Sequence, residues 1–261
     1  GIVGGVATTL GLGVPLVSAM IATLFEVEDS MLIKISVLAF WTALFGTSVY
    51  KGLKAGIKIL ADINVVLAIF AILFVLIAGP GVFILDLTVN SFGLMFSNFM
   101  STATWTDPIR EGDFPEAWTG FYWAWWFAYT GMVGLFFGRI SRGRTIRQLV
   151  LGVITWGCIG TWLFLAVMGG YSLFLEKTGA LAVTEILNSQ GMSFLNALVI
   201  KSLPFGKITL AIFTVLSIIF YATTIDSSAY VISSICAKDL ENTQEPRRWN
   251  RITWAVLLAL I

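Results

Sequence analysis

The sequence predicts an all-α integral membrane protein, and three observations lead to this fold class. Of its 261 residues, 57% are apolar and only 12% are charged, whereas a soluble domain carries about 25% charged residues. The mean hydropathy is +0.89. Uncharged apolar runs recur along the chain, and a helix of about 17 to 25 residues crosses a hydrocarbon core about 30 Å thick. A transmembrane barrel is not expected, because it would show alternating segments of about 10 residues.

Seven apolar segments are predicted to form transmembrane helices within one domain that covers residues 1–261. A helix satisfies its own backbone hydrogen bonds in lipid, which makes it the expected form of each continuous run. The segments cover residues 2–25, 32–50, 57–79, 121–138, 149–174 and 208–235, and a seventh begins near residue 252. The chain opens inside one apolar run without an initiator Met and stops inside another. We therefore expect it to be part of a longer polytopic protein.

Two connecting stretches are too long for ordinary loops. Residues 80–120 contain an apolar piece at 92–100, with Trp105 and Trp118 nearby. This composition predicts an interfacial helix on the outer membrane surface. Residues 176–205 are also expected to be partly helical.

The distribution of Lys and Arg predicts the orientation of the helices. Eleven of the sixteen fall at one set of helix ends and five at the other, alongside most of the acidic residues of the loops. Positively charged loops face the cytoplasm. The loops at 51–58 and 139–147 are therefore expected to be cytoplasmic.

Composition also excludes several classes of protein. The formal net charge is +1, too low for a nucleic-acid binder that neutralises phosphates. The two cysteines lie in apolar runs, and histidine is absent, which removes the commonest general base and metal ligand. No Gly-x-Ser-x-Gly or metal motif occurs. We expect no enzyme activity, no cofactor and no metal site apart from a coupling ion.

An aromatic run opens the fourth apolar segment. In FYWAWWFAY (121–129), seven of nine residues are aromatic. One interpretation is an aromatic belt at the membrane interface. The other is a cage for a quaternary ammonium group, which has no N–H to donate and is held by ring faces at about 0.5 to 2 kcal/mol each. Helical spacing brings Trp125, Trp126 and Tyr129 close to one another.

The sixth segment carries hydroxyls and one acid within the membrane, in FYATTIDSS (220–228). Such groups are costly in lipid unless they have partners. The hydroxyls either bond back to helix carbonyls or contribute to a sodium site, since hard cations prefer oxygen ligands.

Several motifs together resemble those of the betaine/choline/carnitine transporters. The aromatic run is followed by GRISRGRT (138–145) at the separation found in that family. The likeness extends to WTDP (105–108), FP (114–115), AWT (117–119) and TLGLG (9–13), and it covers essentially the whole chain.

The resemblance implies a LeuT-type core of two inverted five-helix repeats. The seven segments would be the third to ninth core helices, so the first two core helices and both termini of the parent would lie outside this chain. The resemblance also implies a multi-pass protein of the plasma (inner) membrane, assembled as a homotrimer with the interfacial helix as a natural contact.

The same resemblance assigns site residues. Trp125, Trp126, Tyr129 and Met132 would bind the substrate, and a Tyr at position 129 is similar to the carnitine antiporters. The carbonyl of Phe220 and the hydroxyls of Thr223 and Thr224 would bind sodium. Asp226 would have a structural role.

Two modes of coupling remain open. Sodium-independent carnitine antiporters have an Arg at the position of Asn64 and lack the hydroxyl at the position of Thr224, and this chain has neither change. The leading hypothesis is therefore sodium-driven symport of glycine betaine, carnitine or choline by alternating access. The alternatives are a sodium-independent exchanger and a sensor that binds the ligand without moving it.

Overall fold

The computed structural model describes the chain apart from residues 52–57, 110–111, 113, 238–245 and 261. The described residues form helices and turns, with no strand among them. In chain order the helices are α1 (Ile2–Phe25), α2 (Met31–Lys51), α3 (Lys58–Ala78), α4 (Gly81–Ser97), α5 (Phe99–Ala103), the π-helix η2 (Pro115–Gly120), α6 (Phe121–Ile140), α7 (Ile146–Thr178), α8 (Val183–Gln190), α9 (Met192–Lys201), α10 (Gly206–Ile235) and α11 (Arg248–Ala259).

Among the described helices, five are long and apolar enough to cross a membrane, namely α1, α2, α3, α7 and α10. They coincide with five of the seven predicted segments. The fourth segment forms α6, whose many Trp, Tyr and Gly residues lower its hydropathy below that of the five. The seventh forms α11, which has only 12 residues. The number of seven spans and the inverted repeat therefore stay predictions.

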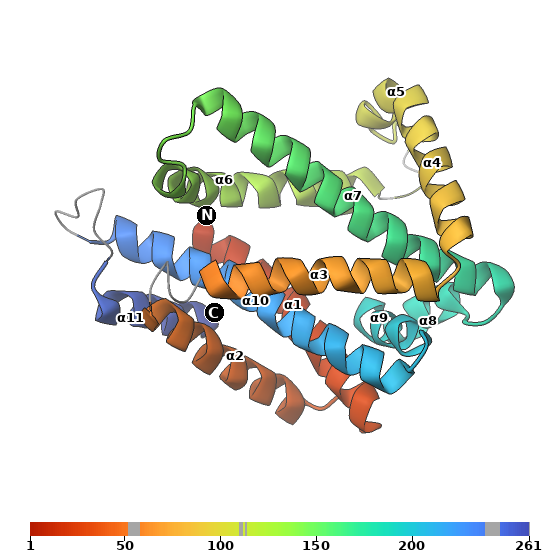
Figure 1. Ribbon diagram of the computed structural model, residues 1–261, viewed down its shortest axis with the longest axis horizontal. Coiled ribbons are helices and arrows are strands. Elements are labelled where there is room, and N and C mark those ends of the chain that lie inside the picture. The colour runs from red at the N-terminus through yellow and green to blue at the C-terminus, as the bar shows by residue number, and fades with distance from the viewer. Residues whose placement is uncertain (52–57, 110–111, 113, 238–245, 261) are drawn as a thin grey trace.

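The two long connecting stretches are helical. The helix α4 begins at Gly81, eleven residues before the apolar piece that the sequence singled out, and ends at Ser97. It runs across the end of α3 rather than alongside it (Figure 1), as an interfacial helix would. Residues 176–205 contain α8 and α9, so the expectation of partial helix is confirmed there.

Helices α1 and α10 form the centre of the molecule (Figure 1). The helix α10 contacts α1, α2, α3, α6, α9 and α11. Their crossing is close: a Cβ atom added to Gly13 would lie 2.8 Å from the Tyr221 ring. Trp41 of α2 is fully buried against that ring, with the two ring centroids 5.4 Å apart.

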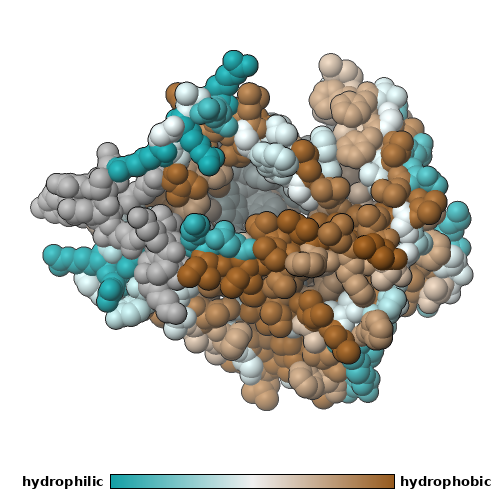
Figure 2. Space-filling view, viewed as in Figure 1, coloured by the Kyte–Doolittle hydropathy of each residue, from teal (hydrophilic) through white to brown (hydrophobic). Residues whose placement is uncertain are grey.

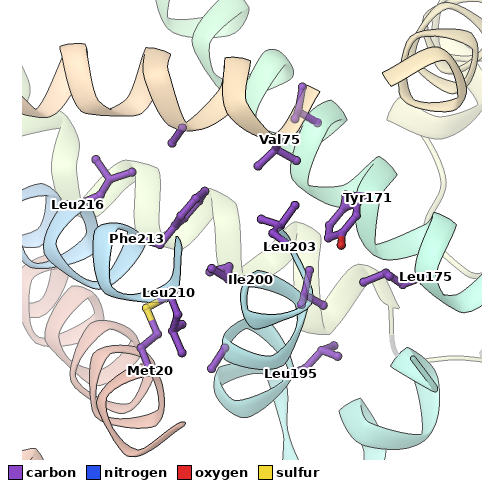
Figure 3. Packing of buried hydrophobic residues seen from close by; sticks show 14 of the residues in the cluster. Met20, Val75, Tyr171, Leu175, Leu195, Ile200, Leu203, Leu210, Phe213 and Leu216 are labelled. Atoms are coloured by element: carbon purple, nitrogen blue, oxygen red, sulfur yellow. The ribbon is translucent and has the colours of Figure 1, made fainter. Parts of the chain in front are cut away.

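An apolar cluster joins six helices at the end of the bundle opposite α11. It packs Met20 of α1, Val75 of α3, Tyr171 of α7, Ile200 of α9 and Phe213 of α10 (Figure 3), together with Ile84 of α4. The helices α3 and α10 run in opposite directions (Figure 1), and this cluster holds them together at one end.

Apolar and charged side chains separate on the surface. Brown, hydrophobic residues cover α3 and the adjoining part of α2 (Figure 2), and exposed apolar residues such as Ile69, Phe70 and Ile77 belong to this area. The described ends of the α2–α3, α6–α7 and α10–α11 connections lie together at one end of the bundle (Figure 1). The loops predicted to be cytoplasmic thus share one side, although residues 52–57 of the first lie outside the described part.

Ion pairs hold the C-terminal end of α1. Glu26 ends the helix in a left-handed conformation with φ 58°. Its carboxylate lies 3.0 Å from Lys207 Nζ of α10 and 3.5 Å from Lys201 Nζ of α9. The hydrogen bond from Lys207, and then the charges of both lysines, hold the pKa of Glu26 below its usual value.

The two cysteines are free thiols on exposed sites. Cys158 lies within α7, and Cys236 directly follows the last residue of α10.

Candidate functional site

The aromatic run forms the first turns of α6 and continues directly from η2 without a loop. Trp125 is half-buried, and Tyr129, four residues later, is buried. Their rings meet edge to face with centroids 5.8 Å apart, a geometry that aromatic pairs prefer. Phe121 stacks on the other side of Trp125 at 6.0 Å. The aromatic contacts therefore continue over two turns of one helix.

Tyr129 is held by α1. Its hydroxyl donates to the Gly5 carbonyl at 2.9 Å and lies 2.6 Å from the Thr9 hydroxyl. A Cβ atom at Gly5 would lie 2.7 Å from the Tyr129 ring, so the absence of a side chain at Gly5 is what allows this approach. The hydroxyl of Tyr129 is thus used within the protein, while its ring remains beside Trp125.

Trp126 has a different environment from Trp125. Its centroid is 6.2 Å from that of Trp125, but its side chain is 66% exposed. A step of one residue turns a side chain by about 100° around a helix, which moves Trp126 away from α1. The structure brings Trp125 and Tyr129 together on one face and leaves Trp126 beside that face.

Met132 lies on the same face as Tyr129 and contacts α10. It is buried, and the Ser228 hydroxyl donates to its sulfur at 3.0 Å. Met132, Tyr129 and Val231 form a small apolar cluster between α6 and α10. The predicted substrate residues therefore span the junction of α1, α6 and α10.

The predicted sodium ligands lie on one turn of α10. The hydroxyl of Thr223 lies 2.7 Å from the carbonyl of Phe220, to which it donates. Thr224 is adjacent, and its carbonyl accepts a hydrogen bond from Ser228 at 2.8 Å. Two of the three predicted oxygens are thus neighbours, and the chemistry of carbonyl and hydroxyl suits a hard cation. The bond between them equally fits the local back-bonding that the sequence left open.

Asn64 lies on α3, which packs against α10. The Asn64 Oδ1 atom is buried and has no hydrogen-bond partner among the described residues.

Asp226 lies where α10 packs against α2. It is fully buried, and Ser48 of α2 lies beside it. It follows Phe220 by six residues, about 120° around the helix, while Thr223, three residues before it, lies nearer, at about 60°. Its position is that of a packed residue between α10 and α2, in keeping with the structural role expected from the sequence.

Thr9, Gly5 and Ser228 were missed as site residues by sequence reasoning. Thr8 and Thr9 are adjacent and chemically identical, so no pattern ranks one above the other. In the structure Thr8 is half-buried and its hydroxyl donates to the Gly4 carbonyl of its own helix, whereas the Thr9 hydroxyl lies 2.6 Å from that of Tyr129. Only the contact between α1 and α6 separates the two.

Comparisons with known proteins agree with one another. A family model described as BCCT, betaine/carnitine/choline family transporter, matches residues 1–261. A carnitine transporter of Acinetobacter baumannii is 32% identical over 242 residues, which are 93% of this chain and 44% of that protein.

Two proteins of Escherichia coli K12 are similar to the same extent. Its high-affinity choline transport protein is 34% identical over 263 aligned residues, covering 100% of this chain and 39% of that protein. The uncharacterized transporter YeaV is 33% identical over 241 residues, covering 92% and 50%. The chain thus spans half or less of the length of these relatives.

Proposed function

The chain belongs to the betaine/carnitine/choline transporter family, and on this basis we propose that it carries part of a secondary transporter for a quaternary ammonium compound. The substrate is glycine betaine, carnitine or choline, and sodium drives its symport. The transporter is a multi-pass protein of the plasma (inner) membrane.

The observation that carries this proposal is the pair of rings formed by Trp125 and Tyr129. They meet at 5.8 Å on the face of α6 that turns towards α1. A trimethylammonium group has no hydrogen-bond donor, so ring faces are the groups best suited to hold it. Trp126, next to Trp125 and largely exposed, is placed to close over a bound cation, and Met132 lines the side towards α10.

Sodium binding is proposed at the Phe220 carbonyl and the Thr223 and Thr224 hydroxyls. The 2.7 Å separation of the first two oxygens supports this placement. The unpartnered Asn64 Oδ1 on α3, a helix that packs against α10, supports it further, because a neutral side chain leaves the local positive charge to a mobile ion. The proposed sodium site is half-buried and lies next to Ser228 on α10. Because the Ser228 hydroxyl contacts the Met132 sulfur, a change at the sodium site would reach the substrate site through this single contact.

Coupling follows from differential affinity. A ligand shifts a conformational equilibrium only by binding one state more tightly than the other. Sodium on α10 would favour the outward-open state that accepts the substrate, and joint release on the inside would return the empty carrier. The LeuT-type inverted repeat supplies the two states in this proposal.

A homotrimer is part of the same proposal. The helix α4 presents Val82, Leu85 and Val89 as exposed apolar residues, and it crosses the end of α3 (Figure 1). Substituting Val82 and Val89 with Ser should weaken the trimer, as measured by mass photometry of the purified protein.

Uptake by the native protein in liposomes tests the function. Labelled glycine betaine, carnitine and choline are supplied with and without an inward sodium gradient. Accumulation of one of them only with sodium would establish the symporter. Exchange that needs internal substrate but no sodium would instead establish the antiporter. Binding without uptake of any of the three would leave a ligand sensor.

A further inference from the structure

The hydroxyl of Tyr129 has no hydrogen left for a substrate. A phenol donates one hydrogen bond, and this one goes to the Gly5 carbonyl at 2.9 Å. Thr9 lies at 2.6 Å, where its own hydroxyl can donate to the phenol oxygen. Both of these partners belong to α1, so the polar end of Tyr129 is directed towards that helix.

We propose that Thr9 is a positioning residue of the substrate site, which orients the Tyr129 ring so that its π-system, rather than its hydroxyl, faces the cation. This inference rests on the proposed function and extends it to a residue on a different helix. Thr9 does not touch the substrate itself.

Two independent contacts define the ring position. At one point the ring lies against Gly5, where no Cβ atom would fit. At the other the hydroxyl lies 2.6 Å from that of Thr9, which is 7% exposed and also lies 3.0 Å from the Gly5 carbonyl, so that the one Thr9 hydrogen is shared between these two oxygens. A ring held at its edge and at its tip keeps one orientation, and cation–π attraction depends on the cation lying over the ring face.

The arrangement also explains why a tyrosine suits position 129. A phenylalanine would fill the space beside Gly5 but lose both bonds to α1. Thr9 would then retain only its bond to the Gly5 carbonyl. The pair Thr9 and Tyr129 should therefore act as one unit, which a double-mutant cycle detects.

The test uses the native protein in liposomes and whichever of labelled betaine, carnitine or choline it transports. A competing analogue carries a tert-butyl group in place of the trimethylammonium group, so that it has the same shape without the charge. Thr9→Val should raise the KM for the cation about three- to tenfold, with the maximal rate and the inhibition constant of the neutral analogue unchanged. Thr9→Ser should restore the KM.

The matched control is Thr8→Val, which removes a neighbouring hydroxyl that bonds only within α1 and should leave the KM unchanged. Tyr129→Phe should shift the KM in the same direction, and adding Thr9→Val to it should have little further effect. An equal loss of affinity for the neutral analogue, a full further shift in the double variant, or no difference from Thr8→Val would overturn the inference. If the unaltered protein takes up none of the three compounds, the proposed function fails first.

Discussion

Helix α6 carries the proposed substrate residues and α10 the proposed sodium ligands, yet the two helices differ in how much of each is packed against the rest of the protein. Nearly half of the residues of α10 are buried, and it touches six other helices. Of the α6 side chains that the structure describes, only Tyr129 and Met132 are buried, although its first turns contain the densest aromatic run of the chain. The ion half of the site therefore belongs to the packed centre, while the substrate half is anchored at two points. We infer that substitutions at the packed crossing of α10 with α1 act on stability, and those on the α6 aromatics and on the proposed ligands act on affinity.

The largest effect should come from the crossing of α1 and α10. In Gly13→Ala the new methyl group would lie 2.8 Å from the Tyr221 ring, and overpacking of this kind costs about 1–3 kcal/mol. The matched control is Gly11→Ala, where nothing lies within 4 Å of the added atom. Thermal unfolding of the purified protein should show a lower midpoint for the first variant only. Equal midpoints would mean that the centre is not closely packed.

A smaller effect, on affinity rather than stability, is expected at Trp125. Trp125→Leu removes the ring that meets Tyr129 at 5.8 Å and should weaken trimethylammonium binding at least tenfold, or about 1.4 kcal/mol. Trp123→Leu is the control, because that ring is 63% exposed and its described ring contact is with Phe127. Substrate-induced quenching of tryptophan fluorescence measures both. An equal loss in the two variants would favour an aromatic belt over a cage.

A smaller change in affinity is expected at the proposed sodium site. Thr223→Ala together with Thr224→Ala should raise the sodium concentration for half-maximal uptake about three- to fivefold, which corresponds to the loss of about one polar contact. Ser227→Ala serves as the control, since its hydroxyl donates to the Thr223 carbonyl at 2.9 Å and is not a proposed ligand. If the control and the double variant behave alike, the hydroxyls only satisfy the helix and sodium binds elsewhere.

The smallest effect is expected at the exposed end of α1. Because the lysines lower the folded-state pKa of Glu26 from its ordinary value of 4.5, the pair stabilises the fold above that pH and loses this contribution as the pH falls through the lowered pKa. Glu26→Gln should therefore reduce the unfolding temperature slightly at pH 7, by an amount that salt diminishes. The difference from the unaltered protein should vanish in acid. A constant difference at every pH would assign the effect to packing.

The sequence predicted the elements that depend on continuous hydrophobicity. The bounds of α1 agree with the predicted segment. The ends of α2, α3, α7 and α10 lie within a few residues of the predicted ends. The helix α4 begins eleven residues before the apolar piece noted in the sequence, because Asp86, Thr88 and Asn90 interrupt the hydrophobic pattern and a helix needs no purely apolar sequence at an interface.

The site residues were predicted by type and spacing, but their partners were not. Four-residue spacing on α6 indicated that Trp125 and Tyr129 share a face, and the ring contact follows it. Nothing in the local pattern specified that Tyr129 would bond to Thr9, or Met132 to Ser228, because each pair joins residues about 100 positions apart or more. Such pairs form where two helices cross, and the periodicity of one helix does not indicate which other helix it crosses.

The two thiols are sites at which this chain can be labelled for spectroscopy. Cys236 stands at the end of α10, on the side of the bundle with the basic loops, whereas Cys158 lies about 18 Å along α7 on a surface of exposed apolar residues such as Ile154 and Leu165. A polar maleimide reaches a thiol from water and not from hydrocarbon, so of these two thiols it should label Cys236, next to α10, and leave Cys158 unlabelled. Movement of α10 during a transport cycle could then be followed by fluorescence without introducing any residue into the chain.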